Sequence, residues 1–114
     1  MGEVRRSDVL IVGAGVIGLA LARSLHKKAG GSITVVDRRD PGLEASYAAA
    51  GMLAPQAEAD SPDEFFRFCR ASNAIYPDFA SSLMDETGVD IGFDDSGTLY
   101  LALNEHDLSE LSRR

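Results

Sequence analysis

The sequence has little of what marks several large classes of protein. It contains a single cysteine, Cys69, among 114 residues, so no disulfide can form within the chain and no cysteine-based metal site is indicated. We therefore expect a reducing, cytoplasmic compartment, with Cys69 as a small core residue. The longest apolar stretch, VLIVGAGVIGLALA, is broken by three glycines and is too short to span a bilayer.

Positive charge is also scarce. Lys and Arg number 11 against 18 Asp and Glu, and the formal net charge is -7. A nucleic-acid surface needs clustered Lys and Arg, so we expect no nucleic-acid partner. What remains is an ordinary globular composition, 45% apolar and 25% charged, in a chain long enough for one small domain.

Two different patterns of apolar residues follow one another near the N-terminus. Residues 9–12 are continuously apolar and end at Gly13, as in a strand of a parallel sheet. From Val16 to about Ala29 the apolar residues recur at helical spacing, and SITVVD at 32–37 is typical of a second strand. The pattern predicts an α/β fold with a Rossmann-like, right-handed βαβ unit of parallel strands.

The rest of the chain is predicted to be mostly helical. Residues 38–61 indicate a loop with one short helix near 46–51. Ser61 is predicted to cap a helix whose first position is Pro62, and the helical pattern then runs on, with a break before Pro77, to Gly88.

Two further elements are predicted before the chain ends. Residues 89–103 indicate two short strands around a turn at Asp94–Gly97, and Asn104 with Asp107 indicates a capped helix. A βαβ unit with one hairpin has few places to bury both faces of its sheet, so we expect the chain to be the front part of something longer.

The glycines between the first strand and helix carry a binding motif. Gly13, Gly15 and Gly18 form G-x-G-x-x-G in the strand–turn–helix context that the motif requires. The first glycine permits the tight turn, the second lets a pyrophosphate approach the backbone, and the third allows close packing of helix on sheet. The N–H groups and dipole at Val16 and Ile17 favour the phosphate charge.

An acid at the end of the second strand fits the same motif. Asp37 lies where a carboxylate accepts hydrogen bonds from an adenosine ribose. Arg38 and Arg39 follow it, and an arginine here can hold the 2′-phosphate of NADP, although Asp37 would repel that group and both arginines also suit a solvated loop. The motif recognises only the ADP half, so NAD, NADP and FAD all remain open.

The segment after this unit, EASYAAAGMLAPQAE at 44–58, has almost no side chains of any size. It suits either a flexible alanine-rich linker or a backbone surface for a large flat group, and Gly51 permits close approach. VLIVGAGVIGLALA, VVDRRD and ASYAAAGMLAPQAE together resemble the D-amino-acid oxidase-like FAD-dependent oxidoreductases, and within them the bacterial glycine oxidase branch. The resemblance spans about residues 7–114.

The resemblance implies a bound FAD with its pyrophosphate over residues 13–17 and its ribose on Asp37. It places Arg38 near the adenine and the 45–46 pair along the phosphates or ribitol, with residues 50–52 at the isoalloxazine ring. Asp37 occupies the position where the family more usually has Glu, and residues 44–45 occupy positions where Thr or Arg is often found. The predicted cofactor-binding residues are Gly13, Gly15, Val16, Ile17, Gly18, Asp37, Arg38, Ala45, Ser46, Ala50, Gly51 and Met52.

The resemblance also implies a domain division and a reaction. Residues 1–60 would be the N-terminal part of the FAD-binding domain, and residues 61–114 a helical segment with the beginning of the substrate domain. The reaction would be oxidative deamination of glycine or another small amino acid or amine to an imine, with O2 reduced to hydrogen peroxide, linked to thiamine biosynthesis. We expect the intact protein to be a homo-oligomer.

No catalytic residue and no metal ligand is assigned. His26 and His106 suit exposed helix positions, and Asp94-Asp95 suits a turn. Two alternatives stay open: an FAD-dependent D-amino-acid or sarcosine-type dehydrogenase, and a non-catalytic nucleotide-binding fragment or assembly subunit.

Overall fold

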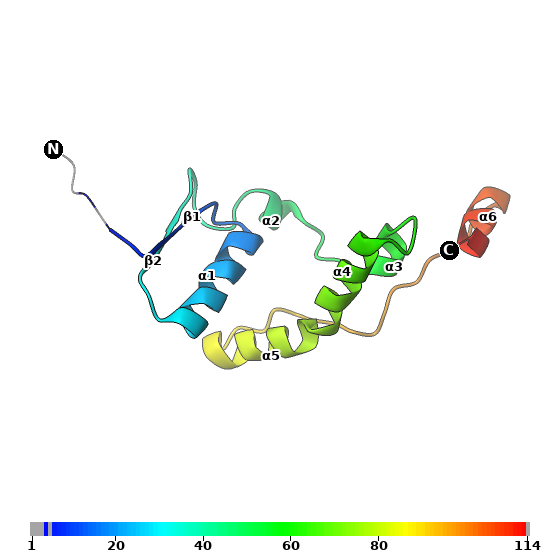
Figure 1. Ribbon diagram of the computed structural model, residues 1–114. Coiled ribbons are helices and arrows are strands. Elements are labelled where there is room, and N and C mark those ends of the chain that lie inside the picture. Colours follow the sequence, from blue (N-terminus) through cyan, green and yellow to red (C-terminus); the bar gives the residue numbers. More distant parts are fainter. Residues whose placement is uncertain (1–3, 5, 114) are drawn as a thin grey trace. The chain divides into compact units, whose positions relative to one another are not determined.

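The computed structural model describes residues 4 and 6–113, which form two compact units, Met1–Gly51 and Met52–Arg114 (Figure 1). The division falls nine residues before the boundary at residue 60 that the sequence predicts, and the assignment of the two regions to domains stays a prediction.

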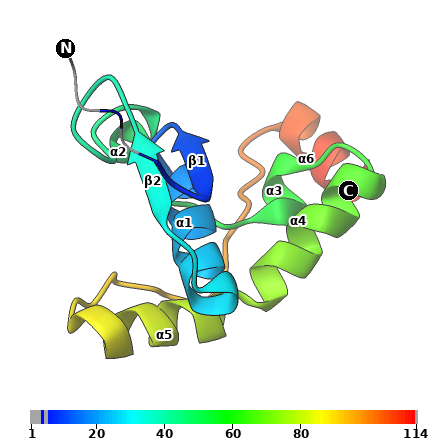
Figure 2. The same ribbon diagram turned by 60° about the vertical axis from the view of Figure 1, so that its left-hand side comes forward.

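The first unit is the predicted βαβ motif. Strand β1 (Val9–Val12) leads into helix α1 (Val16–Ala29) and then into strand β2 (Ile33–Val36). The strands are parallel neighbours, with Val9 opposite Ile33 and Val12 opposite Val36, and α1 packs on both (Figure 2). All three elements agree with the predicted ranges to within about one residue.

Two local devices close this motif. Gly30 adopts the left-handed conformation, φ 63°, and ends α1 as the sequence predicts, after a last turn that carries His26, Lys27 and Lys28. At the same end of the motif, just before both strands, the Asp8 carboxylate accepts hydrogen bonds from Ser32 N–H (2.8 Å) and Ser32 Oγ (2.7 Å). This pair fixes where both strands begin.

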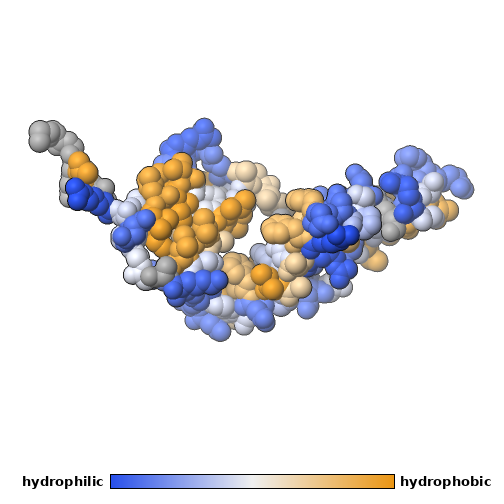
Figure 3. All heavy atoms as spheres, in the orientation of Figure 1, coloured by the Kyte–Doolittle hydropathy of each residue, from blue (hydrophilic) through white to orange (hydrophobic). Residues whose placement is uncertain are grey.

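Only one face of the two-stranded sheet is covered. Ile11 points toward α1 and is 8% exposed, whereas Leu10 and Val12 are 60% and 80% exposed. Figure 3 shows a continuous area of apolar atoms on this unit. A continuously apolar strand is typical of a sheet covered on both faces. Among the described residues of this unit only α1 packs on the sheet, which agrees with the expectation that this chain has few places to bury both faces.

Two one-turn helices follow the sheet. Helix α2 (Ala45–Ala48) lies at the end of the first unit, close to the short helix predicted near 46–51. Helix α3 (Pro55–Glu58) belongs to the second unit and is not predicted. Its start at a proline, preceded by Ala54, has the ordinary pattern of a helix first turn.

Helices α4 (Glu64–Ala74) and α5 (Tyr76–Thr87) are the two longest helices of the second unit. The break before Pro77 and the end at Gly88, φ 70°, are confirmed. The predicted cap is wrong: Asp63, not Ser61, is the N-cap of α4, and its carboxylate accepts from Phe66 N–H at 2.9 Å. Asp63 is the N-cap because it immediately precedes the first helical residue.

The predicted strand pair is also wrong. Residues 89–103, all of which the structure describes, form no strand. The predicted turn is present, because Asp94 accepts a hydrogen bond from Ser96 N–H at 2.8 Å. The segment is attached to α5 through Phe93, whose ring lies 5.4 Å from that of Tyr76.

Helix α6 (Glu105–Arg113) begins with the predicted cap. Asn104 Oδ1 accepts from Asp107 N–H at 3.0 Å, and Asp107 Oδ2 accepts from Leu103 N–H at 3.0 Å. The two side chains therefore both accept hydrogen bonds from backbone N–H groups at the start of the helix.

Candidate functional site

The turn between β1 and α1 is built by glycine geometry. Gly13 adopts φ 109° and donates its N–H to Val36 O at 2.8 Å, which ties the turn to the end of β2. A Cβ added at Gly18 would lie 1.9 Å from Gly13 O. Only glycine at position 18 lets α1 start this close to the end of the strand.

The N-terminus of α1 is open to a ligand at the backbone. Gly15 precedes the helix in extended conformation and offers no side-chain cap. Val16 N–H donates to the hydroxyl of Ser46 at 2.9 Å. Ile17 and Gly18 have no intrahelical acceptor, because the residues four positions earlier precede the helix. These N–H groups and the helix dipole form an anion site.

Ser46 brings α2 to this turn. Its Oγ lies 3.1 Å from the position that a Cβ on Gly15 would take, and its side chain is half-buried. Its hydroxyl can also donate a hydrogen bond to a phosphate oxygen. The contact of Ser46 with Val16 brings one residue of the 45–46 pair to the glycine turn, and the role of the pair along the phosphates or ribitol stays a prediction.

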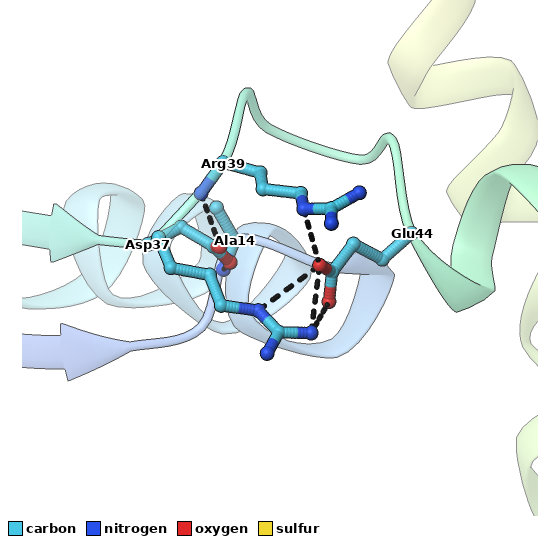
Figure 4. Close-up of polar contacts among 5 residues, drawn as sticks. Ala14, Asp37, Arg39 and Glu44 are labelled. Carbon is cyan, nitrogen blue, oxygen red and sulfur yellow. Dashed lines mark hydrogen bonds and ion pairs between the residues drawn. The ribbon is translucent and has the colours of Figure 1, made fainter.

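Asp37 fixes the carboxylate corner of the site (Figure 4). Its Oδ2 accepts from Ala14 N–H at 2.6 Å and its Oδ1 accepts from Arg39 N–H at 3.0 Å. These hydrogen bonds, that from Ala14 first, lower the pKa of Asp37, so the side chain stays ionised at neutral pH. A carboxylate has about four acceptor positions, so capacity remains for ribose hydroxyls.

A pocket of about 550 Å³ opens beside this carboxylate, lined by Asp37, Arg38, Arg39, Asp40 and Leu43. Its wall is held in place by Gly42, whose N–H donates to Ala14 O at 2.8 Å. Glu44 binds the two arginine side chains, as Figure 4 shows. The position predicted for the ribose and adenine is therefore hollow and polar.

The remaining predicted residues lie farther along the chain. Ala50 and Gly51 are exposed, Gly51 has φ 78°, and Met52 is 66% exposed at the start of the second unit. Ala45 is the first residue of α2 and is also exposed. The structure thus brings together the turn, Asp37, Arg38 and Ser46, and places residues 50–52 beyond α2.

Sequence reasoning missed two contributors. Ala14 supplies the N–H that holds Asp37 and the carbonyl that holds Gly42, and a main-chain role leaves no mark in the sequence. Glu44 pairs with Arg38 six positions earlier, and the only available signal was an acid close to two bases in a short loop.

Other candidate groups carry no site. His26 and His106 are exposed on α1 and α6, and Asp94 is used by its turn. Among residues 4 and 6–113, no group of three or more His, Cys, Asp and Glu side chains is placed to hold a metal ion. Within the same residues, no helix has the length and apolar character needed to cross a membrane.

Comparison with known proteins decides which dinucleotide family this turn belongs to. The model of the family described as FAD dependent oxidoreductase matches residues 8–114. The chain belongs to the FAD-dependent oxidoreductase family. FAD is that family's cofactor, in agreement with the cofactor expected from the sequence.

Relatives within the FAD-dependent oxidoreductase family share the resemblance over most of the chain. Glycine oxidase of Bacillus licheniformis is 41% identical over 107 residues, which are 94% of this chain and 29% of the relative. The bifunctional protein ThiO/ThiG of Trichormus variabilis is 44% identical over 92 residues, 81% of this chain and 14% of that protein.

A solved structure gives the same picture. The crystal structure of glycine oxidase from Geobacillus kaustophilus superposes with a TM-score of 0.90 at 36% sequence identity, over 96% of this chain and 30% of that one. The predicted α/β, Rossmann-like fold class is confirmed. The chain spans less than a third of the length of these glycine oxidases.

Proposed function

We propose that the chain binds FAD through its ADP half, with the pyrophosphate at the N-terminus of α1 and the adenosine ribose on Asp37. The observation that carries the proposal is the corner itself: a turn with glycine at positions 13, 15 and 18 and main-chain N–H groups at the start of α1, beside an ionised carboxylate that still has free acceptor capacity. The fit is chemical, because backbone N–H groups suit phosphate and a carboxylate suits ribose hydroxyls.

We further propose that the protein oxidises glycine or another small amino acid or amine at its C–N bond, in the context of thiamine biosynthesis. FAD, when bound, accepts the electrons that the substrate loses. The part of this chain is to bind and orient. The Ile17 N–H group at the start of α1 holds phosphate, Ser46 accepts from Val16 N–H and donates its own hydroxyl, and Asp37 holds the ribose. Membership of the family and likeness to proteins named glycine oxidase support this substrate class.

Titration of FAD into the purified chain, followed by flavin fluorescence, tests the binding pose. We expect Gly15→Val to abolish binding, because its side chain would fill the approach to the backbone and meet Ser46 Oγ. Ile17→Ala is the matched control. It changes a side chain that is 82% exposed on the same turn and keeps every N–H group, so it should bind as the unsubstituted chain does. Equal affinity in Gly15→Val and the unsubstituted chain would contradict the pose.

Oxygen uptake by FAD-loaded protein, with glycine, sarcosine and D-alanine compared, tests the reaction. Uptake with glycine and release of hydrogen peroxide are expected. Substrate-dependent reduction of an artificial dye without oxygen uptake would replace the oxidase with a dehydrogenase.

A further inference from the structure

Glu44 binds two arginine side chains at the edge of the proposed nucleotide site. Its Oε1 accepts from Arg38 Nε at 3.0 Å and its Oε2 from Arg38 Nη2 at 2.9 Å, a two-point pairing of carboxylate with guanidinium. Arg39 Nε lies 3.2 Å from Oε1 of the same carboxylate. Figure 4 shows the Arg39 side chain reaching the Glu44 carboxylate.

The backbone of Glu44 is fixed independently of these pairs. Glu44 is the N-cap residue of α2, and its carbonyl accepts from Tyr47 N–H at 3.1 Å and Ala48 N–H at 3.2 Å. The preceding loop is tied to the glycine turn through Gly42 and Ala14. The main chain of Glu44 is therefore placed by the fold and does not depend on the arginines.

Charge in this pocket does not suit an additional phosphate. Two cations, Arg38 and Arg39, line the pocket together with two carboxylates, Asp37 and Asp40, and a third carboxylate, Glu44, binds both arginines. Arginine beside the ribose is how many dinucleotide sites accommodate a 2′-phosphate. Here two of the five N–H donors of Arg38, one at Nε and one at Nη2, are paired with Glu44.

We infer that Glu44 determines nucleotide specificity by occupying Arg38 and Arg39, so that the site accepts adenosine with a free 2′-hydroxyl and rejects adenosine with a 2′-phosphate. The inference rests on the proposed function. Arg38 is 77% exposed and its pair with Glu44 is weak as an isolated ion pair. Discrimination against the 2′-phosphate therefore comes mainly from the Glu44 carboxylate. The phosphate would have to displace this carboxylate from the arginines and would then be repelled by its negative charge.

Competition against bound FAD tests this with two probes that differ only at the 2′ position, 5′-AMP and 2′,5′-ADP. We expect the unsubstituted chain to prefer 5′-AMP. Glu44→Gln keeps the side-chain shape and removes its charge. It should raise the affinity for 2′,5′-ADP relative to that for 5′-AMP by at least about fivefold at low salt, and this gain should shrink as the salt concentration rises. Adding Arg38→Gln to Glu44→Gln should reverse most of that gain. Glu58→Gln on α3 is the matched control for loss of one negative charge and should leave the ratio unchanged.

The outcomes separate the two proposals. An unchanged probe ratio in Glu44→Gln, with FAD still bound, overturns the specificity role and leaves the proposed FAD site standing. Equally weakened binding of both probes to Glu44→Gln also overturns the specificity role, because Glu44 would then only support the loop. Failure of the unsubstituted chain to bind FAD overturns both.

Discussion

The two units of the chain are held together in different ways. In the first unit, side chains and backbone groups more than twenty positions apart are joined, as in Asp37 with Ala14, Ser46 with Val16 and Asp8 with Ser32. In the second unit, many side-chain hydrogen bonds join positions two to four apart, as in Asp63 with Phe66, Ser82 with Glu86 and Asn104 with Asp107. The first unit is a motif closed by polar contacts between distant residues, whereas the second combines locally capped helices with ring contacts such as that of Tyr76 with Phe93.

This difference explains where the binding site lies. A nucleotide site needs groups from several elements held at fixed distances, and the first unit provides them at the carboxyl ends of β1 and β2. The second unit keeps large side chains in water, with Phe65, Phe68 and Ile75 each about 70% exposed. Exposed apolar area of this kind is a feature of surfaces that contact other polypeptide.

The largest expected effect is that of Gly18→Ala, which should break the closure of the first unit. Its Cβ would meet a backbone oxygen, Gly13 O, at 1.9 Å, and backbone cannot move aside as a flexible side chain can. We expect a loss of about 3 kcal/mol or more in the free energy of unfolding, measured by urea denaturation, and faster amide exchange in residues 9–36.

Gly88→Ala is the matched control for that change. It adds the same methyl group in open space at φ 70°, where the cost is only that of the left-handed conformation, about 1–2 kcal/mol. If the two variants lost the same stability, close packing at Gly18 would not be what closes the first unit.

Tyr76→Ala should have the next largest effect and sharpens the description of the second unit. Tyr76 makes the ring contacts with Phe79, 5.6 Å, and Phe93, 5.4 Å. Two such pairs contribute about 1–3 kcal/mol together, so we expect that loss with increased amide exchange in residues 89–103. Tyr47→Ala, at a site 78% exposed, is the control and should change neither. Unaltered exchange in 89–103 would mean that something other than Phe93 attaches this segment.

A smaller effect distinguishes the two candidate caps of α4. Asp63→Ala should cost about 1 kcal/mol, because Phe66 N–H loses its acceptor. Ser61→Ala should cost clearly less, since the Ser61 hydroxyl contacts only Asp63, at 3.4 Å, outside the helix. Thermal unfolding of both variants decides the point, and a larger loss in Ser61→Ala would restore the cap that the sequence predicts.

Caps show what a sequence can and cannot specify here. The strand–glycine–helix–strand order, the helix stops at Gly30 and Gly88, and the Asn104–Asp107 cap were predictable because each is decided within a few residues. Ser61 and Asp63 both have capping side chains two positions apart, and only the actual first helical residue separates them.

Residues 89–103 and Glu44 were harder for a different reason. A strand needs a partner for its N–H and C=O groups, and β-forming residues such as Val89 and Ile91 cannot form one alone. Glu44 reaches Arg38 only because Gly42 turns the loop back onto Ala14. Both outcomes depend on contacts between segments, which periodicity along the chain does not encode.

Asp8→Asn should give the smallest effect and tests whether side-chain pairing between distant residues contributes to the first unit. The pKa of Asp8 is lowered by hydrogen bonds from the Ser32 hydroxyl and then the Ser32 N–H. A carboxyl group with a lowered pKa in the folded state stabilises the fold above its unfolded pKa, near 3.8, and this contribution disappears as the pH falls below that value. The melting temperature of the unsubstituted chain should therefore fall more steeply between about pH 5 and pH 3 than that of Asp8→Asn.

Asp94→Asn is the counterpart in the second unit. The pKa of Asp94 is also lowered, by hydrogen bonds from Ser96 two positions away. The melting temperature of Asp94→Asn should therefore also depend less on pH than that of the unsubstituted chain. Amide exchange separates the two: Asp8→Asn should loosen residues 9–12 and 33–36, which the Asp8–Ser32 pair aligns, while Asp94→Asn should loosen only its own turn. Parallel pH curves for Asp8→Asn and the unsubstituted chain would show that the strands hold their register without this carboxylate, and that the closure of the first unit depends on the glycine turn alone.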